Sequence, residues 1–240
     1  DGTSWIKNCG LINTGTDTMP NDTWTQKQNF GGLGRVGASG FSINGKGYVG
    51  TGSNGNVLVD FWEYNPVTNA WTQKANVPAS IVYGIGMAIL YFTELRGYLG
   101  GGTFFGEYNA VTNTWTQKAT MPGGTRMKAV AFAEGNVGYA GTGISGPGGV
   151  WYDDFYAYYP ATNFWSTLQD FPHNTYAAVA FQANGYGYVG TGWHEGVLPL
   201  IPHFKVNTIY RYIGGGWVAA PAIPTGPIDN AIAFSIGNSG

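Results

Sequence analysis

Two irregular segments hold most of the side chains that could do chemistry. Residues 144–154 read ISGPGGVWYDD and residues 193–205 read WHEGVLPLIPHFK, so each places tryptophan beside carboxylates or histidine. The candidate residues in them are Trp151, Asp153, Trp193, His194 and Glu195. Aromatic rings next to a few charged groups suit the C–H faces and hydroxyls of a sugar, and they also suit a protein interface. The segments therefore predict a binding surface for a glycan or a protein partner.

Three further candidates, Arg35, Tyr83 and Arg126, lie just before short apolar segments. The two arginines could hold a sugar carboxylate, and His194 with Glu195 could act as an acid/base pair. Adjacent residues in a loop often point apart, however, so we expect a non-catalytic binding protein. A carbohydrate-active enzyme that uses these residues is the alternative. No nucleophile elbow or phosphate-binding loop is present to favour another reaction.

Metal and cofactor sites are not expected. The three histidines, His173, His194 and His203, stand at no close ligand spacing, and Cys9 is the single cysteine. Structural zinc and copper sites need several such ligands at regular spacing. The sequence therefore predicts no bound metal and no cofactor.

Charge and hydropathy limit the partners. Only 10% of the 240 residues are charged, the formal net charge is −2, and no lysine or arginine cluster occurs, so nucleic acid is not an expected partner. No apolar run is long enough to span a bilayer. The chain begins at Asp1 without a methionine, which fits either removal of a signal peptide or excision from a longer sequence, and we expect a secreted or cell-surface protein.

The elements that must position these residues are repeated. The sequence GYVGTG at 47–52 recurs in variant form at 97–102, 138–143 and 187–192. A tyrosine then precedes a tryptophan by seven residues in three units, and by five in a fourth; the pairs are Tyr64 and Trp71, Tyr108 and Trp115, Tyr158 and Trp165, and Tyr212 and Trp217. Short apolar segments and turn sequences alternate with these marks, which is typical of antiparallel strands. Each unit therefore predicts four strands of an all-β fold.

Four-stranded units of about forty to fifty residues bury their faces by packing around an axis as β-propeller blades. The glycine-rich second strand, the tyrosine and the tryptophan resemble the kelch repeat, and the chain is most similar to secreted bacterial kelch proteins described as galactose-oxidase-like. If the chain is an enzyme, its resemblance to the kelch-fold sialic acid epimerases implies an epimerase-like or hydrolytic activity on carbohydrate. The copper oxidases of this family need a tyrosine followed directly by histidine, and this chain has no such dipeptide. The resemblance to the oxidases thus implies a shared scaffold alone.

The ends of the chain suggest how the ring closes. The segment 233–240 matches 40–47, and the first 24 residues have the length of the strands that would complete that unit. We therefore expect one domain, residues 1–240, with five blades closed by pairing 231–236 with Ser4–Leu11. A piece of a larger array is the alternative. Because the tyrosines and tryptophans recur in every blade, we expect them to pack between blades rather than bind ligand.

Overall fold

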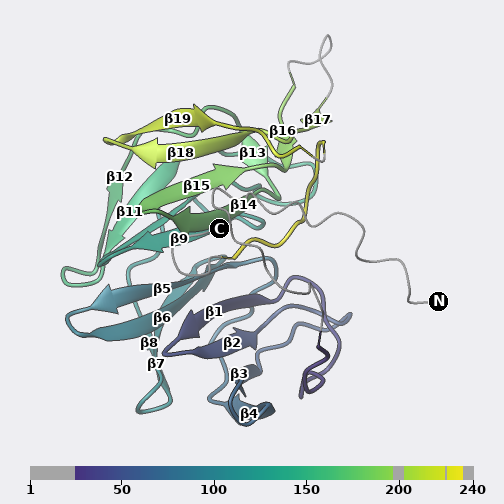
Figure 1. The fold of residues 1–240 in the computed structure, drawn as a ribbon, viewed down its shortest axis with the longest axis vertical. Coiled ribbons are helices and arrows are strands. Elements are labelled where there is room, and N and C mark those ends of the chain that lie inside the picture. Colours follow the sequence, from purple (N-terminus) through teal and green to yellow (C-terminus); the bar gives the residue numbers. More distant parts are fainter. Residues whose placement is uncertain (1–24, 197–202, 225, 235–240) are drawn as a thin grey trace.

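The structure, a computed structural model, describes residues 25–196, 203–224 and 226–234. Those residues form no helix, and thus none that could cross a membrane. They form four four-stranded antiparallel sheets and one small three-stranded sheet. The four large sheets follow one another around the middle of the molecule, each with its first strand nearest the centre (Figure 1). The fold is therefore an all-β propeller, as the repeats predict.

The four blades are numbered here in chain order. Blade 1 contains β1 (Ser39–Ile43), β2 (Lys46–Gly50), β3 (Phe61–Asn65) and β4 (Ala70–Lys74). Blade 2 contains β5 (Ile85–Tyr91), β6 (Glu94–Gly101), β7 (Phe104–Asn109) and β8 (Thr114–Gln117). Blade 3 contains β9 (Val130–Glu134), β10 (Val137–Gly141), β11 (Phe155–Tyr159) and β12 (Phe164–Thr167). Blade 4 contains β14 (Val179–Ala183), β15 (Tyr186–Gly190), β18 (Ile209–Ile213) and β19 (Gly216–Ala220).

The repeated tyrosine and tryptophan pack blade against blade, as expected. In blade 2, Tyr108 and Trp115 are cross-strand partners with ring centroids 5.0 Å apart. The Trp115 ring meets the edge of Phe61 of blade 1 at 5.0 Å, and its Nε1 donates a hydrogen bond to the carbonyl of Ala75 at 3.0 Å. The same contacts recur at Trp71, Trp165 and Trp217. Packing accounts for these residues without a ligand.

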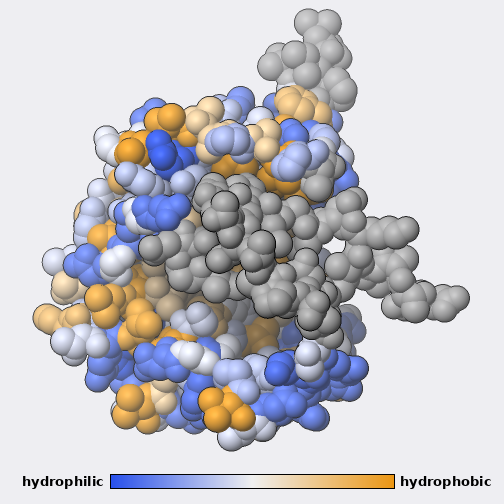
Figure 2. Space-filling model, in the orientation of Figure 1, coloured by the Kyte–Doolittle hydropathy of each residue, from blue (hydrophilic) through white to orange (hydrophobic). Residues whose placement is uncertain are grey.

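Loops of two kinds share one face of the propeller, called the loop face. One kind joins the second and third strands of a blade, and the other joins successive blades. Backbone hydrogen bonds tie the two kinds together, for example Val77 N–H to Val59 C=O at 2.9 Å and Gly143 N–H to Thr175 C=O at 2.7 Å. The opposite face carries the tight turns within blades and is called the hairpin face. Apolar residues on the surface of Figure 2 are scattered among polar ones.

The small sheet belongs to the loop face of blade 4. It consists of β13 (Thr175–Tyr176), β16 (Trp193–His194) and β17 (Phe204–Lys205). In blades 1 and 3 the equivalent segments are joined only by isolated bridges. The long insertion after β15 thus extends an arrangement that the other blades already contain.

A series of backbone hydrogen bonds links the entrances of the inner strands. Each N–H donates to the equivalent residue one blade earlier: Tyr83 to Gly37, Lys128 to Tyr83, Ala177 to Lys128 and Asn230 to Ala177, at 2.7 to 3.1 Å. All five residues have positive φ. Asn230 occupies a fifth equivalent position, although residues 231–234 form no strand. The predicted partner, Ser4–Leu11, lies outside the described residues, so closure of a fifth blade stays a prediction.

Candidate functional site

The inner-strand entrances position the centre of the loop face. Tyr83 and Lys128 adopt φ of 57° and 55°, a left-handed backbone that side chains with a Cβ rarely adopt. Such conformations persist where the surrounding structure imposes them, and they concentrate at functional sites. Here the inter-blade hydrogen bonds impose them. The propeller therefore fixes a tyrosine and a lysine side by side around its axis.

Lys128 lies between two tyrosine rings. Its Nζ is 5.0 Å from the ring centroid of Tyr83 and 5.5 Å from that of Tyr176. The lysine is partly buried, and it forms no ion pair among the described residues. The aromatic faces stabilise the ammonium by cation–π attraction without neutralising it. Lys128 is therefore a positive charge that remains open to a ligand.

Trp151 extends this group toward blade 4. Its ring meets the edge of Tyr176 at 4.5 Å and stacks on His203 at 4.5 Å with an interplanar angle of 29°. Trp151 is held through a bridge to Ile144 within its own loop. We call Tyr83, Lys128, Trp151, Tyr176 and His203 the central rim. It combines one cation with four ring systems from blades 2, 3 and 4.

Trp193 borders the central rim, since it pairs with Tyr176 across β13 and β16. Its Nε1 donates a hydrogen bond to Asp229 at 2.8 Å, and Lys205 forms an ion pair with the same carboxylate at 2.7 Å. Burial alone would raise the pKa of Asp229, but the hydrogen bonds from Lys205 and Trp193 hold it below its usual range. The polar groups around Trp193 are thus already satisfied by one another.

The two predicted arginines lie in ion pairs within their own blades. Arg35 makes two hydrogen bonds to Asp60, at 2.6 and 2.7 Å, and Arg126 contacts both carboxylate oxygens of Asp154. The side chains of Arg35 and Arg126 are 5% and 3% exposed. Hydrogen bonding to Arg35 lowers the pKa of Asp60. Both arginines therefore fasten loops of blades 1 and 3.

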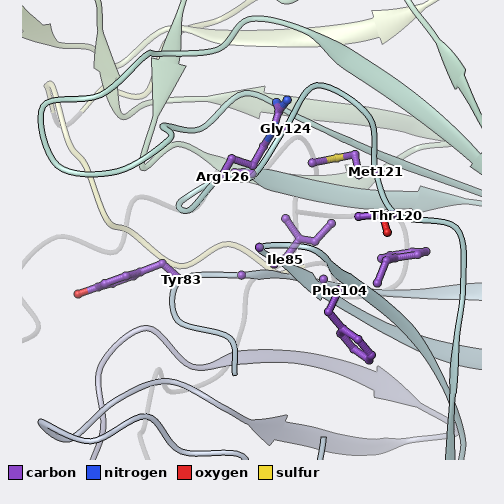
Figure 3. A pocket seen from close by; sticks show the side chains of 13 residues that line it. Tyr83, Ile85, Phe104, Thr120, Met121, Gly124 and Arg126 are labelled. Carbon is purple, nitrogen blue, oxygen red and sulfur yellow. The ribbon is translucent and has the colours of Figure 1, made fainter. Parts of the chain in front are cut away.

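Blade 2 has two apolar residues in place of the arginine and aspartate of blades 1 and 3, which indicates that the ion pair is part of the scaffold. The equivalent residues there are Ile81 and Phe104, which are 1% and 9% exposed and share one apolar cluster. Phe104 lines a crevice of about 20 Å³ together with Ile85 and Met121. Figure 3 shows Tyr83 extending away from these side chains. The crevice has room for about one water molecule, so it is not a ligand pocket.

His194 is buried, with 3% of its surface exposed, and it stacks on His173 at 4.3 Å. Burial, helped by the neighbouring His173, lowers the pKa of His194 to about 4. Its Nε2 has no hydrogen-bond partner in the described part of the chain. His194 is thus a neutral packing residue in this structure.

Among the described residues, Glu195 and Asp153 make no hydrogen bond or ion pair with the central rim. Glu195 is exposed and accepts a hydrogen bond from Nδ2 of Asn174 at 2.6 Å. Burial raises the pKa of Asp153, and the charges of Asp170, Asp154 and Glu195 raise it further.

Of the eight predicted residues, the structure brings Tyr83 and Trp151 into the central rim and Trp193 to its border. In the described ranges, no three His, Cys, Asp or Glu side chains gather as a metal site would require.

Lys128 and Tyr176 are not among the site residues that the sequence predicts. Their signal lies in the repeat itself: Lys128 stands two residues before β9, where the other blades have Gly37, Tyr83 and Ala177. The propeller does not need a charged residue at this position, so the lysine there is the sequence signal that could have indicated a site at the centre of the loop face.

Comparison with known proteins bears on the fold. No family model and no curated protein matches the chain. Its structure is similar to 199 chains of solved structures, so the scaffold is a common one and carries little information about function. One of them, YjhT, has a TM-score of 0.75 and 16% sequence identity, over 92% of this chain and 80% of that one. The similarity establishes the propeller, and the kelch assignment stays a prediction.

Proposed function

We propose that this chain is a non-catalytic binding propeller, secreted or at the cell surface, that recognises a glycan through the central rim. The observation that supports it best is Lys128, an unneutralised ammonium between the rings of Tyr83 and Tyr176. An ammonium donates hydrogen bonds to sugar hydroxyls or pairs with an acidic sugar group. Aromatic rings beside it stack on the apolar faces of the sugar. A role in adhesion would use the same surface.

A protein partner is the second candidate, because the loop face also exposes apolar side chains. Leu33, Val36 and Val57 of blade 1 are 61%, 59% and 51% exposed. Apolar side chains gathered on one face are a common feature of interaction surfaces.

The enzyme alternative relied on Arg35 and Arg126 as holders of a substrate carboxylate. Both guanidinium groups are committed to Asp60 and Asp154, so they do not supply that function in this arrangement. Glu195 remains exposed and could still be tested as an acid or base. Glu195→Gln keeps the shape and removes the basicity, so a binding protein should tolerate it, whereas an enzyme using it should lose about a hundredfold in turnover.

The test is a glycan array followed by calorimetry on the glycans that bind. Trp151→Ala and Lys128→Gln should each weaken binding by about 1–3 kcal/mol, as expected for an interface anchor. Matched controls are Phe92→Ala, a 78% exposed ring on the hairpin face, and Lys27→Gln, an exposed lysine in the segment before blade 1. Both controls should leave the affinity unchanged.

The proposal is overturned if Trp151→Ala and Lys128→Gln bind a confirmed glycan as tightly as the wild type does. Binding of proteins but of no glycan would favour the second candidate, provided that Leu33→Ser or Val57→Ser weakens that binding.

A further inference from the structure

Blades 1 and 2 bury a polar cluster near the hairpin face. In blade 1, the Tyr48 hydroxyl donates a hydrogen bond to Glu63 at 2.8 Å, and Glu63 also pairs with Lys74 at 3.3 Å. Blade 2 repeats the cluster with Tyr98, Glu107 and Lys118, at 2.7 and 3.1 Å. Each carboxylate thus accepts from a buried tyrosine and is neutralised by a lysine.

Blade 3 keeps the tyrosine and loses both charged partners. Tyr139 pairs with Ala157 in the register where Tyr48 pairs with Glu63. Leu168 bonds to the β11 backbone where Lys118 bonds to that of β7. In the described residues, the Tyr139 hydroxyl has no hydrogen-bond partner. The smaller side chains leave a cavity of about 330 Å³ between blades 3 and 4, at the small end of the range for ligand pockets.

Tyrosines from both blades line this cavity, which we call the tyrosine hollow. Tyr139 and Tyr159 come from blade 3, and Tyr186 and Tyr212 come from blade 4. The ring centroids of Tyr139 and Tyr212 are 5.5 Å apart, with an interplanar angle of 54°. The guanidinium of Arg211 lies over the Tyr186 ring at 4.8 Å. Tyr139 stacks on Phe132 at 4.9 Å and Tyr212 packs on Trp217 at 5.1 Å, so these two rings offer a ligand only the parts that those contacts leave free, whereas Tyr159 is 40% exposed.

Glu134 adds a carboxylate to the tyrosine hollow. It ends β9, where the inner strands of blades 1 and 2 bury Ile43 and Ile89 at 1% and 0% exposure. Burial raises the pKa of Glu134, and no described residue forms a hydrogen bond or an ion pair with it. A partly desolvated carboxylate without a counterion is costly, and a bound cation would relieve that cost.

We propose that the tyrosine hollow binds an alkylated ammonium group, with Glu134 as its counterion and the faces of Tyr139, Tyr159 and Tyr212 as its walls. Alkylammonium cations are attracted to aromatic faces and tolerate a site with few hydrogen-bond acceptors. The site lies between blades 3 and 4 and shares no residue with the central rim. It is therefore independent of the glycan proposal.

Choline is the first probe, and 3,3-dimethylbutan-1-ol, its uncharged isostere, is the matched control ligand. Calorimetric or NMR titration of the wild type should show saturable choline binding. Glu134→Gln should weaken it by about tenfold or more, because the cation loses its counterion. The double change Ala157→Glu with Leu168→Lys restores the cluster of blades 1 and 2, fills the hollow and should abolish binding. Glu94→Gln, on an exposed carboxylate of blade 2, should change nothing.

Three results would overturn the proposal: no saturation by choline up to about 50 mM, equal binding of the uncharged isostere, or unchanged affinity in Glu134→Gln. If the double variant fails to fold, the affinity of Glu134→Gln for choline is sufficient to test the proposal. Titration with Nε-trimethyllysine beside choline shows whether the ammonium that fits best is carried by a small alcohol or by a lysine side chain. Tighter binding of either compound supports the assignment.

Discussion

His194 couples the stability of blade 4 to pH. Its pKa is lowered to about 4 by burial and by His173, whereas an unfolded histidine titrates near 6.5. Between these values the unfolded chain takes up a proton that the native state does not. The free energy of unfolding should therefore fall as the pH drops from about 6.5 toward 4, by up to about 1.4 kcal/mol per pH unit, and should gain nothing from this residue above 6.5.

The measurement is urea unfolding between pH 4 and 8 for the wild type and His194→Leu. Carboxylates and His173, whose pKa burial also lowers, contribute to the slope in both proteins, so the difference between the two slopes reports on His194 and its contact with His173. Identical slopes for the wild type and His194→Leu would mean that His194 protonates in the native state as it does when unfolded.

At the scale of residues, the sequence shows which side chains are repeated from blade to blade, but it does not show which side chains contact one another. Trp151 stands in an insertion and was found by that signal, and it lies in the central rim. The sequence places Arg35 and Arg126 at the entrances of inner strands, but it does not show that Asp60 and Asp154, 25 and 28 residues further along the chain, are their partners. Spacing along one chain does not show which charges neutralise each other, since strand register decides that.

At the scale of elements, the tryptophan of the fourth strand should stabilise the blade contact. Trp165 is 6% exposed, packs on Phe105 of blade 2 at 5.0 Å and donates a hydrogen bond to Ala119 C=O at 2.7 Å. Trp165→Ala should lower the free energy of unfolding by about 3–5 kcal/mol through the cavity that it leaves. Trp151→Ala, in the loop, should cost less than about 1 kcal/mol. Equal losses in thermal or urea unfolding would show that Trp151 is a structural residue.

Most strands were predictable because each large blade repeats the same alternation between glycine-rich turns. The small sheet of β13, β16 and β17 was not, because its strands are two residues long and their partners come from separate loops. The tyrosine hollow could not be predicted from the sequence for a similar reason. Ala157 looks unremarkable in sequence, and its meaning depends on the register that places it where blades 1 and 2 have Glu63 and Glu107.

At the scale of the whole molecule, the inter-blade hydrogen bonds point to a fifth unit. Gly37, Tyr83, Lys128, Ala177 and Asn230 are equivalent in backbone conformation and in bonding order, and the last of them precedes the apolar segment 231–236. Composition and repeats were enough to predict the propeller. They could not show how the ring closes, because closure depends on contacts between segments far apart in the chain.

Hydrogen exchange tests the closure directly. If residues 231–236 form the innermost strand of a fifth blade with Ser4–Leu11, their amides should exchange slowly, because ladder hydrogen bonds protect them. Replacing Ser4–Leu11 with glycine and serine of equal length should abolish that protection and expose a strand edge that promotes aggregation. The amides of β5, an inner strand away from the seam, serve as the control within the same molecule and should stay protected. Protection of 231–236 that survives the replacement would show that another segment pairs with them, and fast exchange in the unaltered chain would rule out the fifth blade.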